Sequence, residues 1–296
     1  MAMGRGRGSR LAHIVAACAA STLLASCFGG SDVAPSPSAP STSVAGDRTD
    51  AQEQPSATPT PDPDPPPREG ACRRVSVDGL RTIVNDDRPV RCRRAHTVVT
   101  FFVGELPDSA TRGATAASDG RVERAADRIC RSEFRDHVGG DRTSRRLSML
   151  TPTYFLPSSE QFELGARWVR CDAYAYATPD RLADMPRNVE DALDREIAQQ
   201  RFGRCSPVSP SDAQFRHVAC FVPHQWRAID TRQLGPPDEA YPGRTTMQDR
   251  ARAQCEDVVR DYLGTDESFS FGFEVPQREA WAGGDRLSLC WVETSE

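Results

Sequence analysis

Two stretches of this chain carry the same residues at the same offsets: PSSEQFELGARWVRC at positions 157–171 and PQREAWAGGDRLSLC at positions 276–290. Both fit the pattern P-x2-E-x-[FW]-x2-G-x-R-x3-C, which is too long to recur by chance. The separation of about a hundred residues is far above the period of solenoid repeats. The recurrence therefore predicts two homologous domains.

A matching series of cysteines leads up to each stretch. Each series contains a C-x3-H element, which is Cys92 with His96 in the first copy and Cys220 with His224 in the second. The order and rough spacing of the two sets agree: Cys72, Cys92, Cys130 and Cys171, then Cys205, Cys220, Cys255 and Cys290.

Residues 1–26 are predicted to be a lipoprotein signal peptide. Three arginines precede an apolar stretch over residues 11–25, which is shorter than the roughly 20 apolar residues of a membrane-spanning helix. The small residues before Cys27 predict a diacylglyceryl anchor on that cysteine and cleavage before it. We expect the mature chain on the extracytoplasmic face of the cell membrane; an ordinary cleaved signal and an uncleaved anchor are the alternatives.

Residues 27–69 are rich in Pro, Ser and Thr, and they are predicted to form a disordered tether because they cannot bury a core. The formal net charge of the chain is -5, and removal of the signal arginines makes it more negative. This balance argues against nucleic acid as a partner. The expected link to the membrane is the lipid.

The cysteine count predicts disulfides. Of ten cysteines, Cys18 leaves with the signal and Cys27 is lipidated, so eight remain, four in each copy. An even, patterned set in an exported protein indicates a disulfide framework, with free buried cysteines as the alternative. Within each copy we favour pairing first with second and third with fourth, which clamps a hairpin and joins the helix to the last strand. Each bridge should contribute roughly 2 to 4 kcal/mol.

Hydrophobic periodicity predicts an α+β fold in which each domain is a small antiparallel sheet with one packed helix. In copy one, residues 70–178, we expect a helix over 121–137 and strands at 75–77, 90–91, 96–103, 147–155 and 167–176. In copy two, residues 204–296, we expect a helix over 246–263 and strands at 218–222, 269–275 and 287–292. Residues 179–203 are predicted to be a polar connector, helical over 188–200.

The C-x3-H elements are the first candidates for chemistry. A cysteine and a histidine at this spacing could supply half of a zinc site, but zinc needs a second ligand pair and thiolates, so we expect no metal and no cofactor. His96 and His224 are then expected to be structural residues at the start of a strand, with partner binding as the alternative.

The closing motif supplies the second set of candidates. Phe162 and Trp281 occupy one motif position, and we expect them to pack against the last disulfide of each copy; contact with a ligand is the alternative. The motif glutamate and arginine are expected to form an ion pair that closes a turn, or else to be functional charges: Glu160 with Arg167, and Glu279 with Arg286.

Known catalytic motifs do not occur in the sequence, which has no G-x-S-x-G, H-E-x-x-H or P-loop pattern. We therefore expect a non-enzymatic envelope protein that binds another exported protein or the cell wall. A wall-modifying or redox enzyme that uses an exposed histidine or a labile disulfide is the first alternative. A structural or sensory ectodomain is the second.

The chain resembles the actinobacterial septum-formation domain family, on the C-x3-H element, Ala-x3-Cys on the helix, and the closing Gly-x-Arg and cysteine. The helix element occurs at residues 126–130 and 251–255. The resemblance covers about residues 72–292 in two copies. Copy one departs from the family in having Phe162 where tryptophan is usual and in its longer first inter-cysteine loop. The resemblance implies a link to division or envelope growth, without a mechanism.

Overall fold

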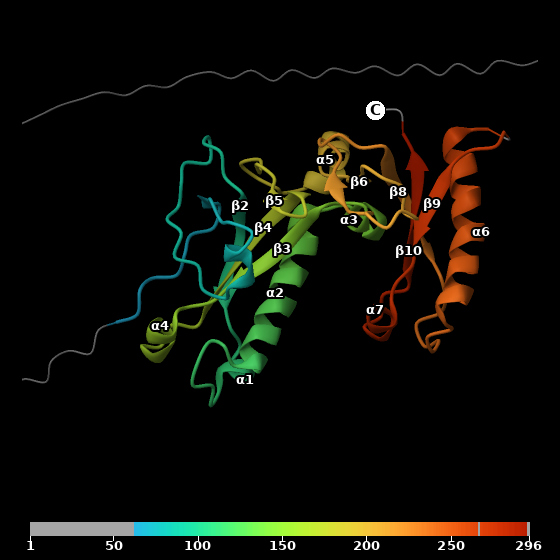
Figure 1. Ribbon diagram of the computed structural model, residues 1–296. Helices are drawn as coiled ribbons and strands as arrows, with labels where there is room; N and C mark the ends of the chain where they lie inside the picture. The colour runs from blue at the N-terminus through green and yellow to red at the C-terminus, as the bar shows by residue number, and fades with distance from the viewer. Residues whose placement is uncertain (1–61, 266, 295–296) are drawn as a thin grey trace, which may run out of the picture. The chain divides into compact units, whose positions relative to one another are not determined.

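The computed structural model describes residues 62–265 and 267–294 of the 296-residue chain (Figure 1). The predicted signal peptide, Cys27 and most of the predicted tether lie outside the described residues. Two five-stranded antiparallel sheets each pack against one long helix, which confirms the α+β class. None of the helices in the described ranges is both long and apolar enough to cross a membrane.

The first sheet has the strand order β1-β2-β4-β3, and β5 pairs with β4. Its strands are β1 (Cys72–Arg73), β2 (Val98–Glu105), β3 (Leu150–Phe155), β4 (Trp168–Thr178) and β5 (Arg181–Leu182). The helices around it are α1 (Asp108–Thr111), α2 (Gly120–Val138), α3 (Arg142–Arg146) and α4 (Ser159–Glu163), with a 3-10 turn at Gly79–Arg81.

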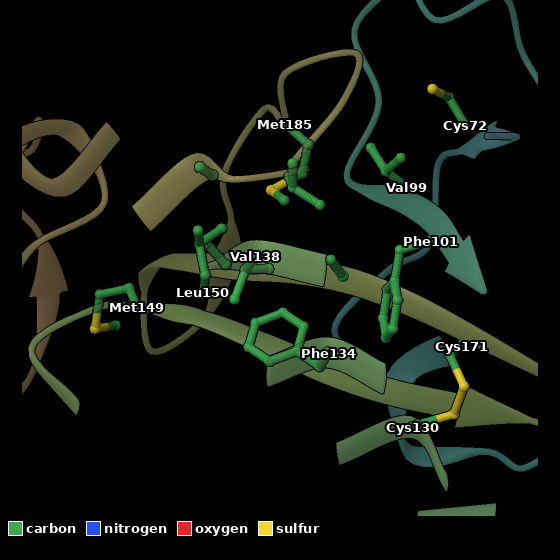
Figure 2. Packing of buried hydrophobic residues seen from close by; sticks show 14 of the residues in the cluster. Cys72, Val99, Phe101, Cys130, Phe134, Val138, Met149, Leu150, Cys171 and Met185 are labelled. Carbon is green, nitrogen blue, oxygen red and sulfur yellow. A yellow bond between two sulfur atoms is a disulfide. The ribbon is translucent and has the colours of Figure 1, made fainter. Parts of the chain in front are cut away.

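Helix α2 packs on this sheet because its apolar residues recur at helical spacing. Val122, Ala126, Cys130, Phe134 and Val138 are all buried. Asp119 caps the helix by accepting a hydrogen bond from the backbone of residue 121, and a glycine with φ of 66° ends it. Figure 2 shows Phe134 and Val138 among buried residues from β2 and β3.

The second sheet has the order β7-β6-β8-β10-β9. Its strands are β6 (Arg204–Ser206), β7 (Val218–Ala219), β8 (Trp226–Gln233), β9 (Phe271–Glu274) and β10 (Leu287–Glu293). Helix α6 (Arg244–Leu263) packs on it, α7 (Arg278–Ala282) precedes β10, and a 3-10 turn (Ala192–Asp194) and α5 (Glu196–Arg201) come before the sheet. The path β6-β8-β10-β9 follows the same order as β1-β2-β4-β3 in the first sheet.

The predicted long helices and closing strands agree with the structure to within a few residues at each end. The prediction for residues 75–77 is wrong, because they form no strand. The Thr97 side chain instead bonds both the N–H and the carbonyl of Val75, which replaces a strand partner. Residues 90–91 contribute only an isolated bridge between Cys72 and Val90. Strand β8 was missed, since charged residues interrupt its apolar alternation.

The segment 179–203 differs from the polar connector that we predicted. It begins with β5, and its helical part is split between the 3-10 turn and α5. Its apolar side chains are buried in the core of the first sheet: Ala183, Met185, Val189, Leu193 and Phe202. The segment is therefore part of the packed structure. The sequence did not predict this, because the apolar residues are spaced too irregularly to form a helical or strand pattern.

Candidate functional site

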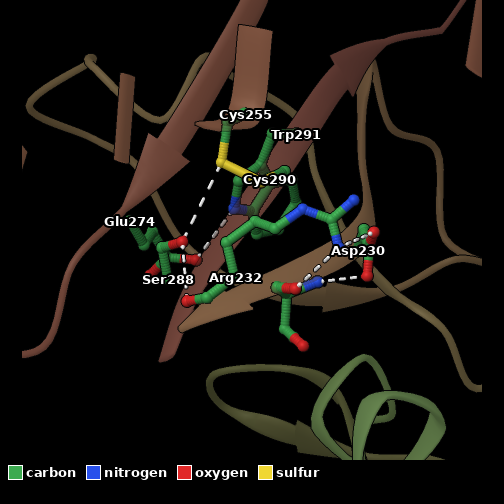
Figure 3. The surroundings of a disulfide bond; sticks show 8 residues. Asp230, Arg232, Cys255, Glu274, Ser288, Cys290 and Trp291 are labelled. Carbon is green, nitrogen blue, oxygen red and sulfur yellow. Dashed lines mark hydrogen bonds and ion pairs between the residues drawn. A yellow bond between two sulfur atoms is a disulfide. The ribbon is translucent and has the colours of Figure 1, made fainter. Parts of the chain in front are cut away.

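The four disulfides join first to second and third to fourth cysteine in each set, as we favoured: Cys72–Cys92, Cys130–Cys171, Cys205–Cys220 and Cys255–Cys290. Two of these bridges tie a long helix to the central strand β4 or β10. Figure 3 shows the bridge between α6 and β10, with Trp291 and Glu274 beside it. The bridges thus fix the helix on each sheet.

The histidines of the C-x3-H elements are buried, with exposed fractions of 2% for His96 and 7% for His224. The two ring nitrogens of His96 bond the carbonyls of Arg94, at 2.8 Å, and Pro186, at 3.1 Å. In His224, Nδ1 bonds the Val222 carbonyl at 2.8 Å. A ring held among backbone carbonyls organises the loop before a strand, so we assign both histidines a structural role.

One group of potential metal ligands occurs in the described part of the chain. The ligand atoms of Cys205, Cys220 and His224 lie within 4.8 Å of one another. The two sulfurs are bonded to each other, however, and zinc binds thiolates. Metal binding here would first require reduction of the disulfide.

The motif aromatics are buried as well, with exposed fractions of 1% for Phe162 and 2% for Trp281. The guanidinium of Arg167 lies 4.0 Å from the Phe162 ring centroid, and that of Arg286 lies 4.1 Å from the Trp281 centroid. Trp281 Nε1 also donates to the Glu239 carbonyl at 2.8 Å. In each copy the motif arginine therefore stacks on the buried motif aromatic ring.

The predicted ion pairs of the motif are wrong. Arg167 and Arg286 donate to backbone carbonyls, including those of the aromatic residues beneath them. In the described ranges, Glu160 and Glu279 form no ion pair with them. The motif glycines have φ of 104° and 92°, so the chain turns back after α4 and α7 and each arginine reaches its aromatic ring.

A charged cluster lies inside the first sheet. The Arg170 guanidinium is 3.1 Å from the Asp172 carboxylate, and Thr100 links Asp172 to Arg73 through hydrogen bonds of 2.7 and 2.8 Å. Burial raises the pKa of the Asp172 carboxyl against the attraction of Arg170. All four side chains are buried, so the cluster has no access to a ligand.

The two sheets meet at a junction that ordinary backbone pairing holds together. Met149 N–H donates to the Phe202 carbonyl and Arg204 N–H donates to the Leu147 carbonyl, both at 2.7 Å. Asp285 in the turn before β10 pairs with Arg146 of α3 at 2.6 Å. Side chains from both sheets therefore line the same surface here.

Two adjoining cavities of about 580 and 500 Å³ open at this junction and share Thr151 and Arg204 in their walls. We call them together the arginine groove. The first is lined by six arginines and one carboxylate, Asp285: Arg131, Arg135, Arg142, Arg145, Arg146 and Arg204. The second adds Arg216 and His217.

Sequence reasoning missed the groove. The run RTSRR at residues 142–146 indicates part of the groove, but the negative net charge of the whole chain gave no reason to expect a local positive surface. At the far end, His217 bonds the Glu274 carboxylate at 2.9 Å and stacks on Trp291 with an interplanar angle of 11°. The same carboxylate accepts from Trp291 Nε1 at 3.0 Å, which fixes the position of the His217 ring (Figure 3 shows the Glu274 to Trp291 bond).

The structure thus defines a disulfide-linked α+β protein with a cationic groove between two sheets of equivalent strand order. The chain belongs to the septum formation family: the family of that description matches residues 69–290 in one continuous span across both sheets. No curated protein and no solved structure matches the chain.

Proposed function

We propose that this protein is exported, anchored in the membrane by a lipid on Cys27, and acts at the extracytoplasmic face as a non-enzymatic binding protein with a septum-related role. We call each sheet together with the long helix that packs on it a sheet unit. The observation that carries the proposal is the set of four disulfides, each of which joins two cysteines of the same sheet unit. Disulfides of this density persist in oxidising compartments. Membership of the septum formation family supports the septum-related part.

We further propose that the two sheet units are homologous copies. Four strands of each sheet follow the same order and the long helices and disulfide positions correspond, which supports a duplication, whereas β5 and β7 pair with different strands of their sheets. The correspondence stops at the charged cluster, because Leu289 and Trp291 occupy the positions of Arg170 and Asp172 relative to the last cysteine. The copies have thus diverged, and the arginine groove at their junction is the surface that we propose for binding.

Cell fractionation tests the location. We expect the full chain in the membrane fraction and open to protease in spheroplasts, whereas Cys27→Ala should leave the chain unlipidated and shift it out of that fraction. A chain that remains in the cytoplasm with free thiols would overturn the proposal of export.

Retention on envelope material tests the binding role. We expect the purified Cys27→Ala chain, which lacks the proposed lipid, to sediment with isolated envelopes at low salt and to be released as the salt concentration rises, because screening weakens contacts of exposed charges. If the chain does not sediment at any salt concentration, it is not a binding protein of the envelope.

A further inference from the structure

The inner end of the arginine groove brings the half-buried guanidinium groups of Arg146 and Arg204 close together. Arg146 pairs with Asp285, the only carboxylate in the lining, at 2.6 Å. Arg204 has one side-chain hydrogen bond among the described residues, from Nη2 to the Ser148 carbonyl at 3.1 Å. The Nε atoms of both arginines are buried without a hydrogen-bond partner. Two half-buried guanidinium groups therefore lie close together, and the carboxylates of Glu274 and Asp285 both act on Arg204.

This arrangement favours the binding of an anion, because a cation that is partly removed from water is ordinarily paired. Burial lowers the pKa of the Arg204 guanidinium, and the nearby charge of Arg146 lowers it further. An anion that contacts the exposed guanidinium nitrogens of the two groups would relieve both effects.

Further positively charged side chains lie at the solvent-exposed mouth of the groove. Arg135 and Arg142 are exposed, and in the described ranges neither has a carboxylate partner. Arg145 donates to the carbonyls of Gly139 and Gly140 with the Asp141 carboxylate nearby, and Arg131 pairs with Asp127 at 2.8 Å. The groove therefore offers several positive groups in a row, in a chain whose formal net charge is -5.

A larger cleft beside β9, of about 950 Å³, does not select a ligand in this way. Its lining balances three arginines with three carboxylates: Arg244, Arg252 and Arg278 with Asp212, Glu274 and Glu279. The unbalanced charge distinguishes the arginine groove.

We infer that the arginine groove binds a polyanion that carries phosphate groups along a chain. The inference rests on the proposed binding role of this groove. Guanidinium forks match phosphate oxygens in two-point contacts, and a row of them suits a ligand with repeated anionic groups better than a single carboxylate. The junction supplies donors from α2, α3 and β6, so the ligand would lie across both sheet units.

Competition binding with linear polyphosphate tests the inference, using the full chain purified in neutral detergent. We expect binding that Arg135→Gln combined with Arg142→Gln weakens about tenfold, a loss of about 1.4 kcal/mol for the two charge-assisted contacts together. The matched control is Arg124→Gln with Arg128→Gln, which removes the same charge from exposed positions of α2 outside the groove lining. The control should bind like the original chain.

A further arm tests the need for a chain of phosphates. Displacement of polyphosphate by an anionic phospholipid at the same phosphate concentration would overturn the inference, because a headgroup carries a single phosphate, and failure to displace it would support the inference. Polyglutamate that binds as tightly as polyphosphate, equal weakening in the control, or no polyphosphate binding would each overturn the inference. If polyphosphate fails while the chain still sediments with envelopes, the ligand class is wrong and the proposed function stands.

Discussion

Joint replacement of Cys130 and Cys171 by alanine should remove a large part of the stability of the first sheet unit. The bridge closes a sequence separation of 41 residues, for which chain entropy predicts a loss of about 4 kcal/mol. Both sulfur positions are buried, so the cavities left by the two sulfurs add on the order of 1 kcal/mol. The total of about 5 kcal/mol approaches the whole stability of a small domain.

Urea unfolding of the full chain measures this loss. Far-ultraviolet circular dichroism follows the unfolding, because it reports on both sheets and leaves the buried tryptophans in place. The comparison variant replaces Cys205 and Cys220, whose separation of 15 residues predicts about 3 kcal/mol. A loss below about 1 kcal/mol for the long loop, or a larger loss for the short one, would refute the loop-entropy reasoning.

Three further changes test packing. Asp172→Ala should destabilise the chain by about 3 to 5 kcal/mol in urea unfolding, because it leaves Arg170 buried without its partner; an effect within 1 kcal/mol would show that water enters the cluster. Gly272→Ala should lower the melting temperature, since its Cβ would lie 2.7 Å from a proline side-chain carbon, whereas Gly283→Ala has no contact under 3.4 Å and should be tolerated. Trp281→Phe should destabilise by about 1 to 3 kcal/mol, because it removes the indole hydrogen bond to the Glu239 carbonyl and part of a buried side chain, and no loss in urea unfolding would contradict the assigned hydrogen bond.

The long helices could be predicted because hydrophobic periodicity is a local pattern. The disulfide pairing could be predicted from the number and order of the cysteines in the two matching sets. Cys130 and Cys255 lie on the buried stripe of a helix, where spacing alone places them against a sheet. The repeated closing motif gave the positions of the last strands in the same way. The roles of its residues were less visible, since an arginine that stacks on an aromatic ring and one that pairs with a glutamate have the same spacing.

The structure also decided where the histidines lie. His96 bonds the carbonyl of Pro186, 90 residues away, so its burial depends on a segment that the sequence suggested was a polar connector. Strand β8 became a central strand because β6 and β10 pair with it on either side, although its own alternation is weak.

By itself, the sequence determined two matching sets of cysteines, two amphipathic helices and the strands that follow them, because these features follow from residue periodicity within a few turns of chain. The tertiary structure alone decided the arginine groove. Arg146 and Asp285 are 139 residues apart, and no local pattern relates them. Charges that are dispersed along an acidic chain become a concentrated positive surface only when the two sheets pack at one junction.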